Sequence, residues 1–267
     1  QAPKEFSVVG KRITRIDAYE RVTGQAHYTG DIQLPGMLYA RVLRSTVPHA
    51  KIIGIDISKA EKLPGVRAVI HHGNAQVPWS SGGHTHQRFI FNNPVRYIGD
   101  PVAAVAATDR HIAEDALKLI ELKYEKLPHV LDANEALKPD APKIAPGGNL
   151  SVGKGNFSAP IEESWGDVEQ GLKEADRVFE DTYVTKHVNN AQLERRVSIA
   201  KWDAGKLTVY ASTQGVSNAR TDIARDFNFP LTKVRVVCKY MGGGFGNKNQ
   251  AQDYDYMAAM LAKVAAQ

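Results

Sequence analysis

Four glycines within five residues are the most unusual chemical feature of the sequence. They lie in the loop Met241-Gly242-Gly243-Gly244-Phe245-Gly246-Asn247-Lys248-Asn249, hereafter the glycine loop, directly after an apolar run at 234–238. Glycine adopts positive φ readily and lets a backbone approach a ligand closely. N–H groups exposed in this way stabilise the anionic oxygens of a phosphate or pterin-type ligand without a charged side chain. The glycine loop is therefore the first candidate for a ligand site, and the alternative is a tight turn between a strand and a helix.

Neither of the two common nucleotide-binding motifs fits the glycine loop. A Walker A loop requires lysine directly after its last glycine and then a hydroxyl residue, whereas Asn247 separates Gly246 from Lys248 and Asn249 takes the hydroxyl position. The dinucleotide fingerprint requires the spacing G-x-G-x-x-G and an acidic residue about twenty positions later. The glycines here are spaced G-x-G-x-G, and the chain ends before such an acid could follow. Both motifs are excluded.

Other candidate side chains carry weaker signals. Gln214 follows Ser212-Thr213 at the end of a predicted strand, where its amide could donate to or accept from a ligand, although such a glutamine more often faces water. The segment His84-Thr85-His86 offers two imidazoles, but a metal site usually needs a third ligand nearby. The sequence does not allow a Ser-His-Asp or Cys-His arrangement to be assembled.

Composition narrows the classes of protein further. The 267 residues include 34 Lys and Arg against 29 Asp and Glu, a net charge of +5 that is too mild and too evenly distributed to indicate nucleic-acid binding. The longest apolar run, at 101–107, is far shorter than the roughly 20 residues of a membrane span. The single cysteine, Cys238, excludes a disulfide framework, a cysteine-based zinc site and an iron–sulfur cluster held by this chain alone. Demanding redox chemistry therefore requires an imported cofactor.

The hydrophobic pattern predicts an α+β chain in two parts. Proline and glycine in 136–155 predict a linker, which divides the chain into domains at 1–135 and 156–267. Strands are expected at 38–44, 52–57, 66–71, 101–107, 120–125, 177–184, 197–202, 206–212 and 234–239, and helices at 58–62, after Thr108 or Asp109, at 165–175, 218–227 and 254–266.

Several separated segments together resemble one family, the molybdenum-cofactor-binding large subunits of the xanthine oxidase and aldehyde oxidoreductase family. The resemblance runs in order from about residue 12 to 262, so chance agreement is a poor explanation. It implies a small N-terminal α/β hammerhead domain followed by the first mixed α/β part of the molybdopterin-binding domain, which is incomplete here. The segments are 22–31, 35–40, 44–50, 99–107, 113–128, 212–214 and 242–246.

The resemblance also implies a reaction and a set of site residues. Members of this family oxidise aldehydes or N-heteroaromatic compounds with water as the oxygen source, using a molybdenum-pterin cofactor (molybdopterin or its cytosine dinucleotide). Electrons pass to iron–sulfur clusters and usually FAD, carried on partner subunits or other domains. By match to the motif, Gln214 and Phe245 lie near the molybdenum oxo group, and Gln214, Gly243, Gly244, Phe245 and Gly246 contact the cofactor. No residue of this chain is expected to ligate the metal directly.

The sequence departs from the family pattern in two ways. Xanthine-oxidising relatives carry a purine-binding glutamate where this chain has Asn249, which lines the expected substrate pocket, and this makes xanthine a less favoured substrate. The family's general base and an arginine of the pocket lie in a region beyond Gln267, so this chain is expected to need a further chain or segment for turnover. The expected partners are therefore an iron–sulfur subunit, a FAD or other acceptor subunit, and the rest of the large subunit. No signal peptide can be judged from these residues, and the expected location is the cytoplasm, with the periplasm as the alternative.

Two other interpretations remain at this point. One is a cofactor-binding or assembly scaffold without catalysis, in which the glycine loop only holds a pterin or phosphate. The other is a structural domain whose glycine turn does nothing beyond connecting a strand to a helix.

Overall fold

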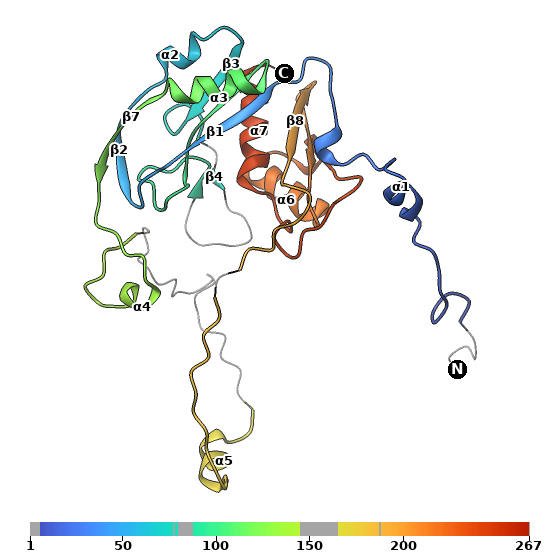
Figure 1. Cartoon of the computed structure of the whole chain (residues 1–267), viewed down its shortest axis with the longest axis vertical. Helices are drawn as coiled ribbons and strands as arrows, with labels where there is room; N and C mark the ends of the chain where they lie inside the picture. The colour runs from blue at the N-terminus through green and yellow to red at the C-terminus, as the bar shows by residue number, and fades with distance from the viewer. Residues whose placement is uncertain (1–5, 77, 80–87, 145–164, 187, 267) are drawn as a thin grey trace.

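The computed structural model describes residues 6–76, 78–79, 88–144, 165–186 and 188–266, and it has the expected α+β architecture (Figure 1). The first part holds α1 (Ala18–Val22), η1 (Thr29–Asp31), β1 (Tyr39–Arg44), β2 (Ala50–Asp56), α2 (Ser58–Glu61), β3 (Val66–His71), β4 (Pro78–Trp79), β5 (Arg88–Phe89), β6 (Pro101–Ala107), α3 (Arg110–Lys118), β7 (Glu121–Lys126) and α4 (Ala133–Ala136). The second holds α5 (Val168–Glu174), β8 (Ser198–Asp203), β9 (Lys206–Ala211), α6 (Val216–Asp226), η3 (Leu231–Lys233), β10 (Val234–Val237) and α7 (Asp253–Val264).

The first part is built around β6. Every residue of this strand is buried, which explains its continuous apolar sequence, and β6 pairs antiparallel with β1 on one side and β3 on the other. Helix α3 packs against β1 and β6 through its buried Ala113 and Ala116. Asp109 begins this helix, because its carboxylate accepts a hydrogen bond from the His111 amide at 2.7 Å. Strands β2 and β7 form a separate antiparallel pair.

The second part contributes a three-stranded sheet in the order β10-β9-β8. Strand β10 runs parallel to β9, whereas β8 and β9 are antiparallel and joined by a short turn. The parallel pairing is possible because α6 crosses over between β9 and β10. Consequently β9 and β10 end at the same edge of the sheet, where the segments with Gln214 and the glycine loop follow them.

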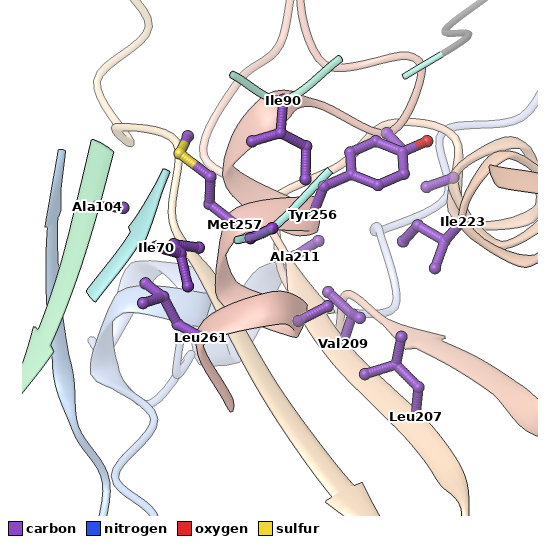
Figure 2. Packing of buried hydrophobic residues seen from close by; sticks show 14 of the residues in the cluster. Ile70, Ile90, Ala104, Leu207, Val209, Ala211, Ile223, Tyr256, Met257 and Leu261 are labelled. Carbon is purple, nitrogen blue, oxygen red and sulfur yellow. The ribbon is translucent and has the colours of Figure 1, made fainter. Parts of the chain in front are cut away.

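Helix α7 joins the two parts into one core. It packs against β8 and β9 of the second part and against β3 and β6 of the first (Figure 2). Tyr256, Met257 and Leu261 are buried on this helix, and the Tyr256 hydroxyl donates to Asp226 Oδ2 at 2.7 Å. The apolar residues of both sheets thus form a single cluster, so the two parts stabilise each other.

The strand expected at 177–184 is wrong: these residues are exposed and make no backbone hydrogen bond with any described residue, and a strand requires a neighbour for its N–H and C=O groups. Of the expected linker at 136–155, residues 145–155 lie outside the described part. Elsewhere the expected elements form with small shifts of their ends.

Among the described residues, none of the helices combines the length and the hydropathy of a transmembrane span.

Truncation of Leu261 tests the shared core. Leu261→Ala removes a side chain that is 3% exposed, and we expect it to lower the free energy of unfolding by about 2–5 kcal/mol in a single transition. Val264→Ala, on the same helix but 50% exposed, is the control and should cost less than about 1 kcal/mol. Urea denaturation followed by circular dichroism measures both. Equal effects of the two substitutions, or separate transitions for the two parts, would contradict this description.

Candidate functional site

The glycine loop and Gln214 meet at the edge of the sheet where β9 and β10 end. Residues 238–252 connect β10 to α7, so the glycine loop is not the tight strand-to-helix turn that was the alternative from the sequence. Gln214 lies between β9 and α6, and its backbone N–H donates to the Lys248 carbonyl at 2.7 Å. The parallel register of two strands, rather than sequence proximity, brings the two candidate segments together.

The side chain of Gln214 is fixed to the glycine loop. Its Oε1 accepts hydrogen bonds from the Gly246 amide at 3.0 Å and the Lys248 amide at 3.3 Å. A Cβ on Gly244 would lie 2.3 Å from that oxygen, so only glycine leaves room for the glutamine here. The Gln214 Nε2 group donates to no described residue, which leaves one oriented amide donor beside the loop.

A buried ion pair between Lys248 and Glu194 fixes the conformation of the glycine loop. Lys248 is 1% exposed, and its Nζ donates to the Glu194 carbonyl at 2.9 Å and to Glu194 Oε2 at 3.0 Å. The same carboxylate oxygen accepts the Gly242 amide at 2.9 Å. One carboxylate and one ammonium therefore tie both ends of the loop together, and a Cβ on Gly242 would come within 2.6 Å of the Glu194 side chain.

Further side chains donate hydrogen bonds to the carbonyl oxygens of the loop. Gln192 Nε2 donates to the Gly244 carbonyl at 2.9 Å and Asn190 Nδ2 donates to the Phe245 carbonyl at 2.7 Å. The Arg21 guanidinium, which lies over the rings of Tyr28 and Tyr240, donates to the Met241 carbonyl at 3.2 Å. Arg196 donates to the Asn247 carbonyl. The oxygens of the loop are thus largely engaged by protein donors.

Three consecutive amides remain available as donors. The N–H groups of Gly243, Gly244 and Phe245 donate to no described residue, whereas those of Gly242, Gly246, Asn247 and Lys248 have partners within the chain. Gly243, Phe245 and Gly246 have φ values of +99°, +50° and +88°. Positive φ is unfavourable for phenylalanine, and the surrounding hydrogen bonds hold it there. A row of unpaired N–H groups is suited to donating hydrogen bonds to an electron-rich ligand.

The other predicted site residues lie nearby but on the solvent side. The Phe245 side chain is 72% exposed, and Asn249 is also exposed, one residue after the buried Lys248. The Asn249 carbonyl lies against the start of α6, because a Cβ on Gly215 would come within 2.3 Å of it. Their assignment to the molybdenum and the substrate stays a prediction.

Sequence reasoning missed the residues that shape the loop. Glu194, Gln192 and Asn190 lie in a stretch without regular secondary structure, about fifty residues before the loop, and hydrophobic periodicity gives no signal for them. Glu194 Oε1 is itself buried without a hydrogen-bond partner among the described residues. His84-Thr85-His86 lies outside the described part of the chain, and the described residues hold no group of three His, Cys, Asp or Glu that could bind a metal.

His71 and His72, at the end of β3, are partly buried rather than solvated. Their rings meet edge to face with centroids 5.4 Å apart, and burial lowers the pKa of both imidazoles. The Gly73 amide donates to His71 Nδ1 at 3.1 Å, so this imidazole stabilises a turn.

Comparison with known proteins decides the family. Residues 23–128 match the family described as the a/b hammerhead domain of aldehyde oxidase and xanthine dehydrogenase, and residues 152–267 match the molybdopterin cofactor-binding domain. The chain belongs to the xanthine oxidase and aldehyde oxidoreductase family of molybdenum-binding large subunits. The family resemblance expected from the sequence is therefore confirmed, and so is the fold class.

Individual members of this family align over nearly the whole chain. A probable xanthine dehydrogenase subunit from Bacillus subtilis (strain 168) is 39% identical over 93% of the chain and 33% of its own length. The nicotinate dehydrogenase large molybdopterin subunit of Eubacterium barkeri is 35% identical over 92% of the chain and 56% of its own length. The crystal structure of quinoline 2-oxidoreductase from Pseudomonas putida 86 superposes with a TM-score of 0.83, with 26% identity, over 97% of the chain and 34% of that structure. The chain thus spans about a third to a half of the length of these relatives.

Removal of the buried ammonium tests the ion pair. Lys248→Met leaves the Glu194 carboxylate buried without its counter-ion, and we expect the free energy of unfolding to fall by about 3–5 kcal/mol. Combining it with Glu194→Leu should recover part of that loss, since no charge then remains buried. Lys59→Met breaks an exposed pair with Glu121 and should leave the unfolding midpoint unchanged. If Lys248→Met behaved like the Lys59 control, the pair would not support the loop.

Stability should also depend on the pH through Asp255. Burial raises the pKa of this carboxyl to about 6 from 3.8, despite hydrogen bonds from the Gln252 amide and the Ser198 hydroxyl. Because the folded protein holds the proton more tightly, this contribution to stability is complete below about pH 4 and is lost as the pH rises through 6, a change of about 3 kcal/mol.

Asp255→Asn should remove that pH dependence. Urea midpoints measured from pH 4 to 7 should fall less in the variant than in the wild-type chain. Asp203→Asn, which alters an exposed carboxylate of β8, is the matched control. Parallel pH profiles for wild type and Asp255→Asn would show that Asp255 does not titrate in this range.

Proposed function

We propose that this chain forms one wall of a molybdenum-pterin site in a molybdenum hydroxylase that oxidises an aldehyde or N-heteroaromatic substrate. The observation that carries the proposal is the row of free amides at Gly243, Gly244 and Phe245, fixed beside the oriented Gln214 amide. Oxo groups and the phosphate of a pterin cofactor are acceptors of the kind that these donors fit. The family assignment of residues 152–267 agrees with this use of the loop.

The residues of this chain would bind and orient, while the cofactor supplies the redox chemistry. When bound, the cofactor would supply a two-electron oxidation of the substrate carbon, with water as the source of the oxygen. Gln214 would donate from Nε2 toward a molybdenum oxygen, because its Oε1 is already held by the loop amides. The exposed Phe245 would cover the cofactor side of the site, and the neutral Asn249 would face a substrate that needs no carboxylate partner, which disfavours xanthine.

The rest of the machinery would come from partner subunits and from the remainder of the large subunit, as a separate chain or as a further segment. With Cys238 as the single cysteine of the whole sequence, the iron–sulfur clusters and the FAD or other acceptor would reside on partner subunits. The general base and the far wall of the pocket would belong to the remainder of the large subunit. One relative, from Paenarthrobacter nicotinovorans, is named as the gamma subunit of the 6-hydroxypseudooxynicotine dehydrogenase complex. We place the assembly in the cytoplasm, with the periplasm as the alternative.

Molybdenum content of the purified complex tests this function. We expect about one molybdenum atom per copy of the chain, and at least a tenfold loss in Gly244→Ala, because the added Cβ would displace the Gln214 side chain from the loop. Gly171→Ala, in α5 with open space around the glycine, is the matched control and should keep its metal. Metal-free wild-type complex, or full metal content in Gly244→Ala, would refute the assignment. Full molybdenum content without oxidation of any aldehyde or N-heterocycle would instead indicate the scaffold function.

A further inference from the structure

The peptide group between Met241 and Gly242 lies between two opposite charges. Its carbonyl oxygen accepts a hydrogen bond from Arg21 Nη1 at 3.2 Å, and its N–H donates to Glu194 Oε2 at 2.9 Å. The peptide dipole is negative at the oxygen and positive at the N–H, so both hydrogen bonds are charge-assisted and both favour the same orientation. The guanidinium and the carboxylate therefore align the peptide at which the chain enters the run of glycines.

Without these two charges the same peptide could reverse its direction. Glycine accepts φ of either sign, so a peptide group that precedes a glycine can rotate at low steric cost. A reversed peptide here would point its oxygen at the Glu194 carboxylate and its N–H at the Arg21 guanidinium. Each charge-assisted hydrogen bond would then be replaced by a repulsive contact. Arg21 and Glu194 thus stabilise the observed direction against its reverse.

Glu194 extends this constraint to the next peptide group. Its backbone N–H donates to the Gly242 carbonyl at 3.3 Å. In a planar trans peptide the N–H points opposite to the C=O, so the N–H of Gly243 points away from the Glu194 backbone. Gly243 is the first of the three residues whose amides have no described partner. The direction of its amide therefore depends on how the peptides on both sides of Gly242 are anchored.

The guanidinium of Arg21 is itself held in place for this contact. Its Nε donates to Asp17 Oδ2 at 2.8 Å, and Nη1 also donates to the Tyr28 hydroxyl at 3.3 Å. The guanidinium carbon lies 5.9 Å and 5.4 Å from the ring centroids of Tyr28 and Tyr240, within the range of a cation–π interaction. Helix α1, which carries Arg21, buries none of its residues and lies on the side of the second part, away from β2 and β7 (Figure 1). A surface helix thus contacts a loop residue 220 positions away.

We infer that Arg21 is a positioning residue of the candidate site, which holds the peptide before Gly242 in one orientation and so sets the direction of the amides that follow. This inference rests on the proposed function, since those amides are the ones assigned to the cofactor. Arg21 acts through the backbone of the glycine loop and touches no reacting atom. The alternative is that Arg21 only fastens α1 to the body of the protein, in which case the loop would be insensitive to its removal.

Hydrogen exchange of the Gly242 amide in the purified complex, resolved by fragmentation in a mass spectrometer, tests this inference. Arg21→Met removes the charge and the donors, and we expect the Gly242 amide to exchange at least tenfold faster, because its N–H is then less firmly held at the carboxylate. Arg21→Lys keeps the charge and should exchange less than threefold faster than the wild type. The thermal unfolding midpoint should stay the same in both, since α1 buries none of its residues.

Arg15→Gln is the matched control. Arg15 donates to the same Asp17 carboxylate at 3.0 Å, but its side chain is 67% exposed, and its substitution should leave the Gly242 exchange rate unchanged. Molybdenum content of the same complexes gives a second readout. We expect at least a fivefold loss in Arg21→Met, less than a twofold loss in Arg21→Lys and no loss in Arg15→Gln.

The two readouts separate the inference from the function on which it rests. Unchanged Gly242 exchange in Arg21→Met, equal exchange rates in Arg21→Met and Arg21→Lys, or full molybdenum content in Arg21→Met despite faster exchange would overturn the inference. Faster exchange in Arg21→Met, together with a wild-type complex that holds no molybdenum, would support the role of Arg21 in the loop and refute the proposed function alone.

Discussion

The buried pair of Lys248 and Glu194 is the interaction on which the candidate site depends. A glycine-rich backbone has many accessible conformations, and fixing one of them costs conformational entropy. Here a single carboxylate engages both the Lys248 ammonium and the Gly242 amide, and Gln214 engages two further amides. Donors from Gln192 and Asn190 meanwhile hold loop carbonyls. The consequence is a loop whose conformation is fixed by these contacts, and such preorganisation favours the binding of a ligand by its remaining free donors.

The rigidity of this loop follows from the core beneath it. Helix α7, which begins shortly after the glycine loop, packs between the sheets of both parts of the chain (Figure 2). The edge of the β10-β9-β8 sheet that presents the loop is thereby anchored to the hammerhead part, although the two parts are separated by a long connection. A site on such a frame can be shallow and still hold its geometry.

Much of this arrangement could be predicted from the sequence. The apolar run at 101–107, the Asp109 cap and the glycine spacing carry local signals that do not depend on distant contacts, and the corresponding strand, helix and loop form. The roles of Glu194 and Gln192 could not be predicted, because they arise from contacts across about fifty residues in a segment without periodicity. The strand expected at 177–184 does not form, although its local sequence has the composition of a strand. Strand pairing also requires a neighbouring strand, and the described residues do not supply one.

Anomalous scattering at the molybdenum absorption edge, from crystals of the assembled complex, tests the central claim most directly. The account predicts one strong peak on the side of the glycine loop where Gly243, Gly244 and Phe245 present their amides, within reach of the Gln214 Nε2 group. A peak elsewhere, or a complex without molybdenum in which that side of the loop faces solvent, would contradict it.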